Sequence, residues 1–209
     1  MTIAVVDYGA GNLTSVLKML ERLGEEPQIA RTPEAILAAD RIVLPGVGAA
    51  GEAVEKLRGR GLDAALDETV RKKGRPFLGI CLGMQLLAER LYEFGEHRGL
   101  GWVEGEVRHI NEVAAGQDVS VPHMGWNRVD PTPSGMEFFK RGAASREFYF
   151  AHSYTLRPSD SSVVAAYTGY GADLVSAVRF DSVFATQFHP EKSQVEGEKL
   201  LAAFLDWRP

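Results

Sequence analysis

Short apolar runs alternate with helical patterns through the first half of the chain. The runs at 3–6 and 41–44 are rich in β-branched residues, which is typical of strands buried on both faces of a parallel sheet. Apolar residues at 13, 16, 17, 20 and 23 have helical spacing, with Asn12 as the expected N-cap and Gly24 as the expected end. A weaker strand at 26–30 and a short helix at 33–39 complete the repeat, so the sequence predicts a parallel α/β sheet.

The pattern changes in the second half of the chain. Helical spacing over 62–70 ends at a basic cluster, and beyond residue 93 glycine-rich turns separate short segments at 101–110, 119–129, 147–156, 163–170 and 174–188. These segments predict antiparallel strands added to the parallel core, apart from 184–188, which we expect to run parallel to it. A last helix is expected to begin with a capping box at Ser193 and Glu196 and to turn Leu200, Leu201, Phe204 and Leu205 towards the core.

Composition narrows the class of protein. The chain has 209 residues, of which 45% are hydrophobic, and this is enough to form one domain over 1–209. A net charge of -5 and a pI near 5.6 give no electrostatic footprint for nucleic acid or an anionic membrane. With one cysteine, no disulfide framework or cysteine-rich metal site is expected, and we expect no cofactor. No apolar run approaches the roughly 20 residues of a membrane span and no basic leader precedes the first strand, so we expect a soluble, cytoplasmic protein.

The stretch Gly79-Ile80-Cys81-Leu82-Gly83 joins an apolar strand ending at residue 78 to a helix expected over 84–90. A Gly-x-Cys-x-Gly turn between strand and helix has the form of a nucleophile elbow, in which the nucleophile adopts a strained backbone conformation. At a helix N-terminus, Cys81 can be held as a thiolate and the N–H of Leu82 can donate to an oxyanion. The alternative is that Cys81 is a small buried apolar residue.

A general base is expected at His189, directly after the strand at 183–188. In an extended backbone His189 and Glu191 lie on one face, and Pro190 favours that conformation. An imidazole can exchange protons with a thiolate, and a carboxylate can fix the tautomer of the imidazole. Taken alone, His189 is more typical of a partly buried structural histidine. The carboxyl ends of parallel strands share one edge, however, so Cys81, His189 and Glu191 can meet there.

Residues 46–51 have the form Gly-x-Gly-x-x-Gly, which is also found in dinucleotide sites. We exclude a dinucleotide site because the motif follows the third strand, and because Asp67 and Glu68, about 20 residues on, lie in a helical pattern. The loop is better interpreted as exposed N–H groups that face a molecule bound beside Cys81. An ordinary strand-to-helix turn remains the alternative.

Several motifs together resemble a known family. Residues 79–85 with His189-Pro190-Glu191 resemble the class I (triad) glutamine amidotransferases. The segments at 7–12, 44–48, 122–127, 150–154 and 187–193 resemble, more narrowly, the glutaminase subunits of imidazole glycerol phosphate synthases. The resemblance covers nearly the whole chain. It implies a flavodoxin-like, doubly wound, mostly parallel sheet with added antiparallel strands, and hydrolysis of L-glutamine to glutamate and ammonia.

The resemblance also implies a role for individual residues. Cys81 would form a γ-glutamyl thioester, His189 would act as general base and acid, and Glu191 would orient His189. The backbone N–H groups of Leu82 and of the Val47–Gly48 turn would form an oxyanion hole. A glutamine pocket would comprise Gly48, Gln85, His152, Ser153 and Tyr154. Without the resemblance, the alternation of aromatic side chains through 148–154 is more typical of packing. His97 and His109 receive no function.

The implied partner is a cyclase subunit, a (β/α)8 barrel that forms a heterodimer with this chain and uses the ammonia in histidine biosynthesis. Asn12, Met124, Trp126 and Lys192 would lie near the cyclase, although Met124 and Trp126 also suit a core. Three other functions stay open at this point: an amidotransferase with a different acceptor, a cysteine peptidase built on the same elbow, and a regulatory subunit without chemistry.

Overall fold

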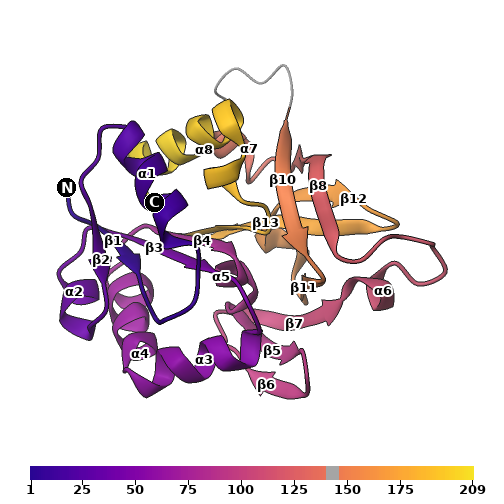
Figure 1. The fold of residues 1–209 in the computed structure, drawn as a ribbon, viewed down its shortest axis with the longest axis horizontal. Helices are drawn as coiled ribbons and strands as arrows, with labels where there is room; N and C mark the ends of the chain where they lie inside the picture. The colour runs from indigo at the N-terminus through magenta and orange to yellow at the C-terminus, as the bar shows by residue number, and fades with distance from the viewer. Residues whose placement is uncertain (140–145) are drawn as a thin grey trace.

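The computed structural model describes residues 1–139 and 146–209 and contains one large mixed sheet (Figure 1). Its strand order is β2-β1-β3-β4-β14-β13-β12-β9. These strands are β1 (Ile3–Val6), β2 (Pro27–Ala30), β3 (Arg41–Gly46), β4 (Phe77–Cys81), β9 (Asp130–Pro131), β12 (Val164–Gly169), β13 (Asp173–Phe180) and β14 (Val183–Thr186). The first five in the sheet are parallel and the last three antiparallel. This confirms the predicted parallel core, including the parallel pairing of β14 with β4, and its order is that of flavodoxin-like sheets.

Helices cover both faces of the parallel strands (Figure 1). One face packs against α2 (Pro33–Leu37), α3 (Ala50–Gly59), α4 (Leu62–Leu66) and the π-helical turn η1 (Asp67–Lys72). The other packs against α1 (Leu13–Arg22), α7 (Met136–Phe139) and α8 (Gln194–Asp206). Because consecutive β-branched residues of β1 and β3 point to opposite faces, both layers are apolar, and the sheet is doubly wound as predicted.

A smaller set of strands extends from the antiparallel side of the main sheet. A four-stranded sheet has the order β11-β7-β5-β6, and β10 pairs with β8 in a separate antiparallel ribbon. The strands are β5 (Ala88–Tyr92), β6 (Glu96–Arg98), β7 (Val103–His109), β8 (His123–Arg128), β10 (Glu147–His152) and β11 (Tyr154–Pro158). The remaining short elements are the helices α5 (Leu82–Gln85) and α6 (Ile110–Val113) and the 3-10 turns η2 (Ser161–Val163) and η3 (Pro190–Lys192). The predicted second-half strands are therefore present.

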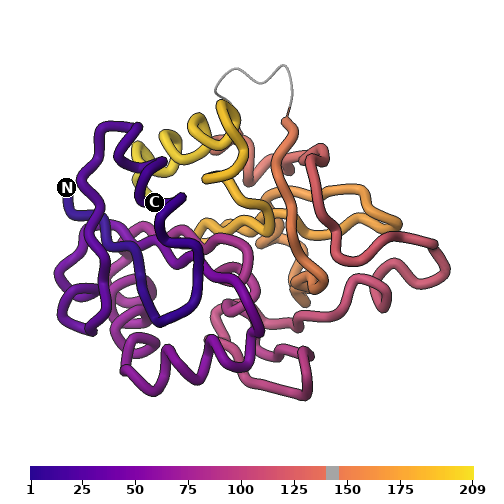
Figure 2. The backbone as a smooth tube through the Cα atoms, viewed as in Figure 1, coloured from indigo at the N-terminus to yellow at the C-terminus, as the bar shows by residue number. Residues whose placement is uncertain are grey.

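The last helix returns to the beginning of the chain. Figure 2 shows α8 next to α1, and the side chains of Arg22 and Glu198 join the two helices at 2.6 Å. Leu200, Leu201, Phe204 and Leu205 of α8 are buried, as predicted from their spacing. Among the described residues, no helix has the length and apolar character needed to cross a membrane.

The helix after Cys81 is much shorter than the sequence predicts. Helical spacing was expected over 84–90, but α5 ends at Gln85 and β5 begins at Ala88. The carbonyl groups of Leu86 and Leu87 accept hydrogen bonds from Leu100 and Trp102, so they are not available for another helical turn. The apolar residues at 86, 87, 88 and 91 are buried. Their pattern suits a helix or a strand, and the pairing of β5 with β7 decides between the two.

The capping box predicted for the last helix does not form, although α8 begins where expected. Ser193 occupies the N-cap position without a side-chain capping bond. Its hydroxyl instead donates to the His189 carbonyl at 2.6 Å and accepts from the Tyr149 N–H at 3.0 Å. Asn12 is likewise at the N-cap of α1, but its amide donates to the Ser15 hydroxyl. The Ser193 hydroxyl therefore holds the histidine segment rather than the helix.

Candidate active site

Cys81 ends β4 in a strained conformation. Its backbone has φ 53° and ψ −104°, which L side chains rarely adopt, and its side chain is 6% exposed. Both flanking glycines are required by close approach: a Cβ on Gly83 would overlap the Leu44 carbonyl, and one on Gly79 would lie 2.8 Å from the Gly83 carbonyl oxygen. The predicted elbow is therefore present, with strand, turn and helix packed too tightly for any side chain at these two positions.

His189 and Glu191 lie where parallel pairing brings the end of β14 beside the end of β4. Thr186 of β14 is in register with Ile80, so the chain three residues later is level with the elbow. His189 Nδ1 donates to Glu191 Oε1 at 2.7 Å, both side chains are buried, and the imidazole is hydrogen-bonded to Cys81. The predicted set of nucleophile, base and orienting carboxylate is thus assembled by the fold.

The imidazole of His189 binds its proton tightly. Burial opposes the charged form, but hydrogen bonds to Cys81 and Glu191 and their negative charges outweigh it and raise the pKa of His189 to about 9. At neutral pH this ring is an imidazolium positioned against sulfur. Such a pair can protonate a departing amine and, once neutral, can take a proton from water.

A pocket of about 580 Å³ opens in front of Cys81. Every residue predicted for the oxyanion hole and the glutamine pocket lines it, namely Val47, Gly48, Leu82, Gln85, His152, Ser153 and Tyr154. Gly48 has φ +99°, a conformation that favours glycine and sets the turn after β3. Residues 47–49 of the loop at 46–51 therefore line the pocket beside Cys81.

Glu93 is a pocket residue that the sequence reasoning missed. It is the single carboxylate among the described residues that line the pocket. Its Oε2 accepts from the Ala50 N–H at 2.7 Å, directly after the turn formed by Val47, Gly48 and Ala49. The residue lies just beyond β5, in the stretch whose strand structure was mistaken for helix, so no pattern placed it at the site. His109, given no function from sequence, also lines the pocket, with its ring 5.2 Å from that of Tyr154.

A directed chain of hydrogen bonds supports His152 behind the pocket wall. His152 Nδ1 lies 2.8 Å from the Tyr154 carbonyl oxygen, which only accepts, so His152 donates there and accepts at Nε2. His123 Nδ1 must then donate to His152 Nε2 across 3.0 Å. Burial lowers the pKa of His123 to about 4; burial, then the neighbouring charges of His123 and His189, lower that of His152 to about 3. Both rings are neutral at neutral pH and fix each other's tautomer.

Of the four residues predicted to face a partner, Met124 is the one that lines the pocket. Met124 and Trp126 of β8 are 64% and 48% exposed. The Trp126 ring meets the edge of Tyr149, and Lys192 Nζ lies 5.8 Å from the centre of the same tyrosine ring. Asn12 is exposed on the loop after β1. Phe94, 88% exposed at the pocket rim, has no counterpart in the sequence predictions.

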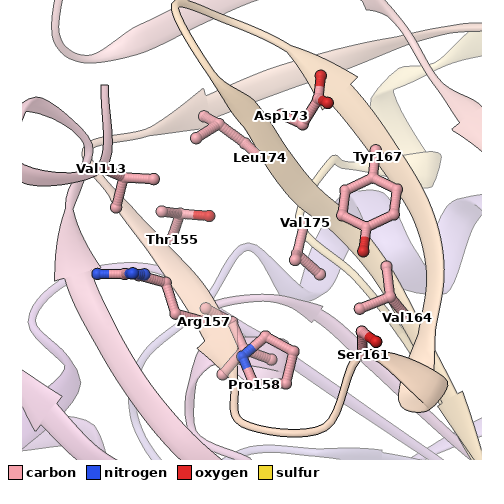
Figure 3. A pocket seen from close by; sticks show the side chains of 11 residues that line it. Val113, Thr155, Arg157, Pro158, Ser161, Val164, Tyr167, Asp173, Leu174 and Val175 are labelled. Atoms are coloured by element: carbon pink, nitrogen blue, oxygen red, sulfur yellow. The ribbon is translucent and has the colours of Figure 1, made fainter. Parts of the chain in front are cut away.

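A second cavity, of about 270 Å³, lies on the other face of β11 (Figure 3). Thr155 and Arg157 of β11 point towards it, opposite Val175 of β13 and Tyr167 of β12. Tyr154, one residue earlier, lines the pocket of Cys81, as expected when successive side chains of a strand point to opposite faces. None of the predicted site residues lines this second cavity.

Comparisons with known proteins agree with this geometry. The family model described as Glutamine amidotransferase class-I matches residues 4–207. Proteins described as imidazole glycerol phosphate synthase subunit HisH are similar: 44% identical in Zymomonas mobilis (100% of this chain, 97% of the relative), and 46% in Rhodopirellula baltica (97% and 96%). A crystal structure of a glutamine amidotransferase superposes with a TM-score of 0.74 at 24% identity and covers 97% of both chains. This last likeness concerns the fold.

Proposed function

The chain belongs to the class-I glutamine amidotransferases and, among them, to the HisH subunits of imidazole glycerol phosphate synthase, and on that premise we propose how its residues act. The protein is a glutaminase of histidine biosynthesis. The proposal is that Cys81, His189 and Glu191 hydrolyse L-glutamine to glutamate and ammonia through a thioester. The observation that carries it is the strained, pocket-lining Cys81 hydrogen-bonded to a His189 that Glu191 holds at 2.7 Å.

Acylation begins with the thiolate of Cys81, which attacks the side-chain carboxamide carbon of glutamine. Negative charge then develops on the carboxamide oxygen, and the backbone N–H groups of Leu82 and of the Val47–Gly48 turn donate to it; these residues line the pocket around the sulfur. The His189 imidazolium gives its proton to the amide nitrogen, the C–N bond breaks, and ammonia leaves. A γ-glutamyl thioester on Cys81 remains.

Deacylation uses the same groups in reverse. His189, now neutral, takes a proton from water, and the resulting hydroxide attacks the thioester carbonyl. The C–S bond breaks, the sulfur leaves as a thiolate, and glutamate departs. Glu191 stays ionised and holds the Nδ1–H of His189 throughout, because the base needs its Nε2 side free for the reacting atoms.

The pocket has groups that suit the amino-acid end of glutamine. Glu93 can pair with the α-ammonium, since it is the one carboxylate among the described lining residues. Gln85, His152, Ser153 and Tyr154 supply neutral polar surface. No lysine or arginine is among the described residues that line the pocket, so recognition of the α-carboxylate is left to neutral donors. Free glutamine, with two opposite charges, fits this lining.

Trapping the thioester with hydroxylamine tests the proposal. Hydroxylamine added during turnover should divert the acyl group into γ-glutamylhydroxamate at the expense of glutamate, and Cys81→Ala should form neither product. Glutamate release by the wild type with no hydroxamate at any hydroxylamine concentration would indicate direct attack of water on glutamine. Turnover by a folded Cys81→Ala would exclude the nucleophile assignment.

The ammonia would pass to a cyclase subunit in a heterodimer. The name of the relatives describes them as subunits of a synthase. The exposed Met124, which lines the pocket, and the exposed Trp126 of the same strand, with Asn12 and Lys192, supply a surface suited to such a partner. A reducing cytoplasm suits an enzyme that depends on one free cysteine.

Trp126→Ala tests that surface. We expect it to weaken binding of the cyclase by about tenfold or more, because half-exposed aromatic residues commonly anchor interfaces. Titration of labelled cyclase gives the dissociation constant, and Ile29→Ala on β2, an exposed apolar residue at the far edge of the main sheet, is the control. Equal affinity of the Trp126→Ala variant and the wild type would contradict the assignment.

A further inference from the structure

The amide side chain of Gln187 lies against the sulfur of Cys81 from inside the protein. Its Nε2 is 3.6 Å from Cys81 Sγ, the length of an N–H···S hydrogen bond. Gln187 is fully buried and, unlike Cys81, does not line the pocket. A buried amide donor therefore reaches the nucleophile from the core, separately from His189 and from the side where substrate enters.

The direction of this hydrogen bond follows from the neighbouring amide. Gln85 Nε2 lies 2.9 Å from the Tyr154 carbonyl oxygen and 3.2 Å from Gln187 Oε1. A carbonyl oxygen only accepts, so the nitrogen of Gln85 faces it. Gln187 must then present its oxygen to Gln85 and its nitrogen to Cys81. The donor role of Gln187 is thus set by the network and not by the choice between two amide orientations.

One short segment delivers both groups to the sulfur. Gln187 and His189 are two residues apart, and His189 has extended backbone angles of φ −101° and ψ 93°. The chain bends at residues 187 and 188, after the end of β14, and both side chains reach Cys81 from this bend. The Gln187 N–H bonds the Ser176 carbonyl at 2.9 Å and the His189 N–H bonds the Tyr149 carbonyl at 2.9 Å, which fixes the segment on both sides.

The short helix after Cys81 gives a thiolate little stabilisation. A thiolate at the start of a long helix is stabilised by the aligned peptide dipoles, but α5 spans only Leu82–Gln85, and a single turn supplies little of this field. Hydrogen bonds to the sulfur must take a larger share. A donor to the charged form of a thiol favours that form.

We infer that Gln187 is a further catalytic residue, which donates a hydrogen bond to the Cys81 thiolate and, braced by Gln85, holds the sulfur facing the pocket. The importance of this bond for turnover rests on the proposed glutaminase function. The hydrogen bond itself does not, because it can be measured without glutamine.

The pH dependence of Cys81 alkylation tests the inference. Gln187→Met removes the donor at similar volume, and Gln187→Glu replaces it with a carboxylate. Iodoacetamide should alkylate Cys81 about tenfold more slowly at pH 7 in Gln187→Met, with the half-maximal rate at a pH about one unit higher, and the effect should be larger in Gln187→Glu. The same substitutions at the exposed Gln28 are matched controls. Folded Gln187 variants with the wild-type pH profile would overturn the inference.

A measurement on the native side chain covers the case in which these variants do not fold. The NMR resonances of the Gln187 side-chain amide should shift in step with ionisation of the thiol in the wild type, and this titration should disappear in Cys81→Ala. Amide resonances that shift identically in both proteins would overturn the inference.

The two hypotheses fail separately. Suppose that Cys81 is alkylated more slowly in the Gln187 variants, as predicted, but that the wild type hydrolyses no glutamine with or without a cyclase. The hydrogen bond from Gln187 is then supported and the glutaminase proposal fails. If glutamine is hydrolysed through Cys81 while the Gln187 variants keep the wild-type alkylation profile and the wild-type ratio of kcat to KM, the inference on Gln187 fails alone.

Discussion

At the scale of single residues, the chemistry depends on how a buried imidazole is kept charged. His189 is removed from water, which disfavours its cation, yet Cys81 and Glu191 hold its pKa near 9. Glu191 has one oxygen on His189, while its second carboxylate oxygen is buried without a hydrogen-bond partner in the described part of the chain. Among the described residues, no other side chain competes with His189 for the Glu191 carboxylate, so the carboxylate interacts mainly with the imidazole.

Glu191→Gln removes this charge while keeping the shape of the side chain. We expect kcat for glutamate release to fall by about a hundredfold or more, because an amide can present its N–H to Nδ1 and hold the wrong tautomer. The alkaline limb of the rate profile should also move to lower pH, because the pKa of His189 falls when the Glu191 charge is removed and the imidazolium that protonates the leaving amine is then lost sooner. Steady-state kinetics over pH 6–9 would measure both effects.

The matched control for Glu191→Gln is Glu147→Gln, an exposed carboxylate at the start of β10. It should keep the wild-type rate and pH profile. A Glu191→Gln variant with near-normal kcat would mean that Glu191 only packs against His189.

At the scale of elements, the site is made by four strand ends that meet along one edge of the sheet. The turns after β1 and β3, the elbow after β4 and the segment after β14 all leave the carboxyl ends of parallel strands. Cys81 and His189 are 108 residues apart in the sequence. They are adjacent in space because β14 pairs with β4. The sheet therefore sets the geometry of the catalytic groups.

The elbow leaves no room for a side chain at Gly83, and Gly83→Ala tests this. A Cβ there would overlap the Leu44 carbonyl in β3, so strand and helix must separate. We expect the free energy of unfolding to fall by about 3 kcal/mol or more, together with loss of glutaminase activity. Urea unfolding followed by circular dichroism gives the difference.

Gly59→Ala is the control for the elbow, because a Cβ at Gly59 meets nothing within 4 Å at the end of α3. It should raise the free energy of unfolding by up to about 1 kcal/mol. Equal stability of Gly83→Ala and the wild type would show that the elbow tolerates a wider strand-to-helix distance.

At the scale of the whole molecule, local patterns predicted more of the site than of its surroundings. Cys81, His189 and Glu191, which the fold brings together, were predicted because each motif is a few residues long and its chemistry depends on residue type and spacing. Glu93 and Gln187 were missed, since their roles depend on contacts with Ala50 and Cys81 that only the folded chain creates. The same limit explains β5: the burial of Leu86 and Leu87 suits helix or strand, and pairing with β7 decides.

Two buried histidines make the stability of the whole molecule depend on pH. The pKa values of His123 and His152 are lowered to about 4 and about 3, so between about pH 6.5 and 4 the unfolded chain binds protons that the folded chain does not. The free energy of unfolding should therefore fall as the pH drops through this range, by about 1.4 kcal/mol per pH unit for each histidine. His189 acts oppositely: its stabilisation is present below pH 6.5 and is lost as the pH rises towards 9.

Urea unfolding at several pH values between 6.5 and 4 checks this dependence. His123→Gln removes one of the two histidines. Its free energy of unfolding should therefore fall less steeply with decreasing pH than that of the wild type, by the contribution of one histidine. Identical slopes in the two proteins would contradict neutral burial of His123.

The most direct test is glutamate release from L-glutamine by the wild type and by Cys81→Ala, each alone and with the cyclase subunit and its nucleotide substrate. Turnover that requires Cys81 and rises when the cyclase and nucleotide are added is the predicted result. Turnover that persists in a folded Cys81→Ala chain, or its absence from the wild type in every mixture, would contradict it.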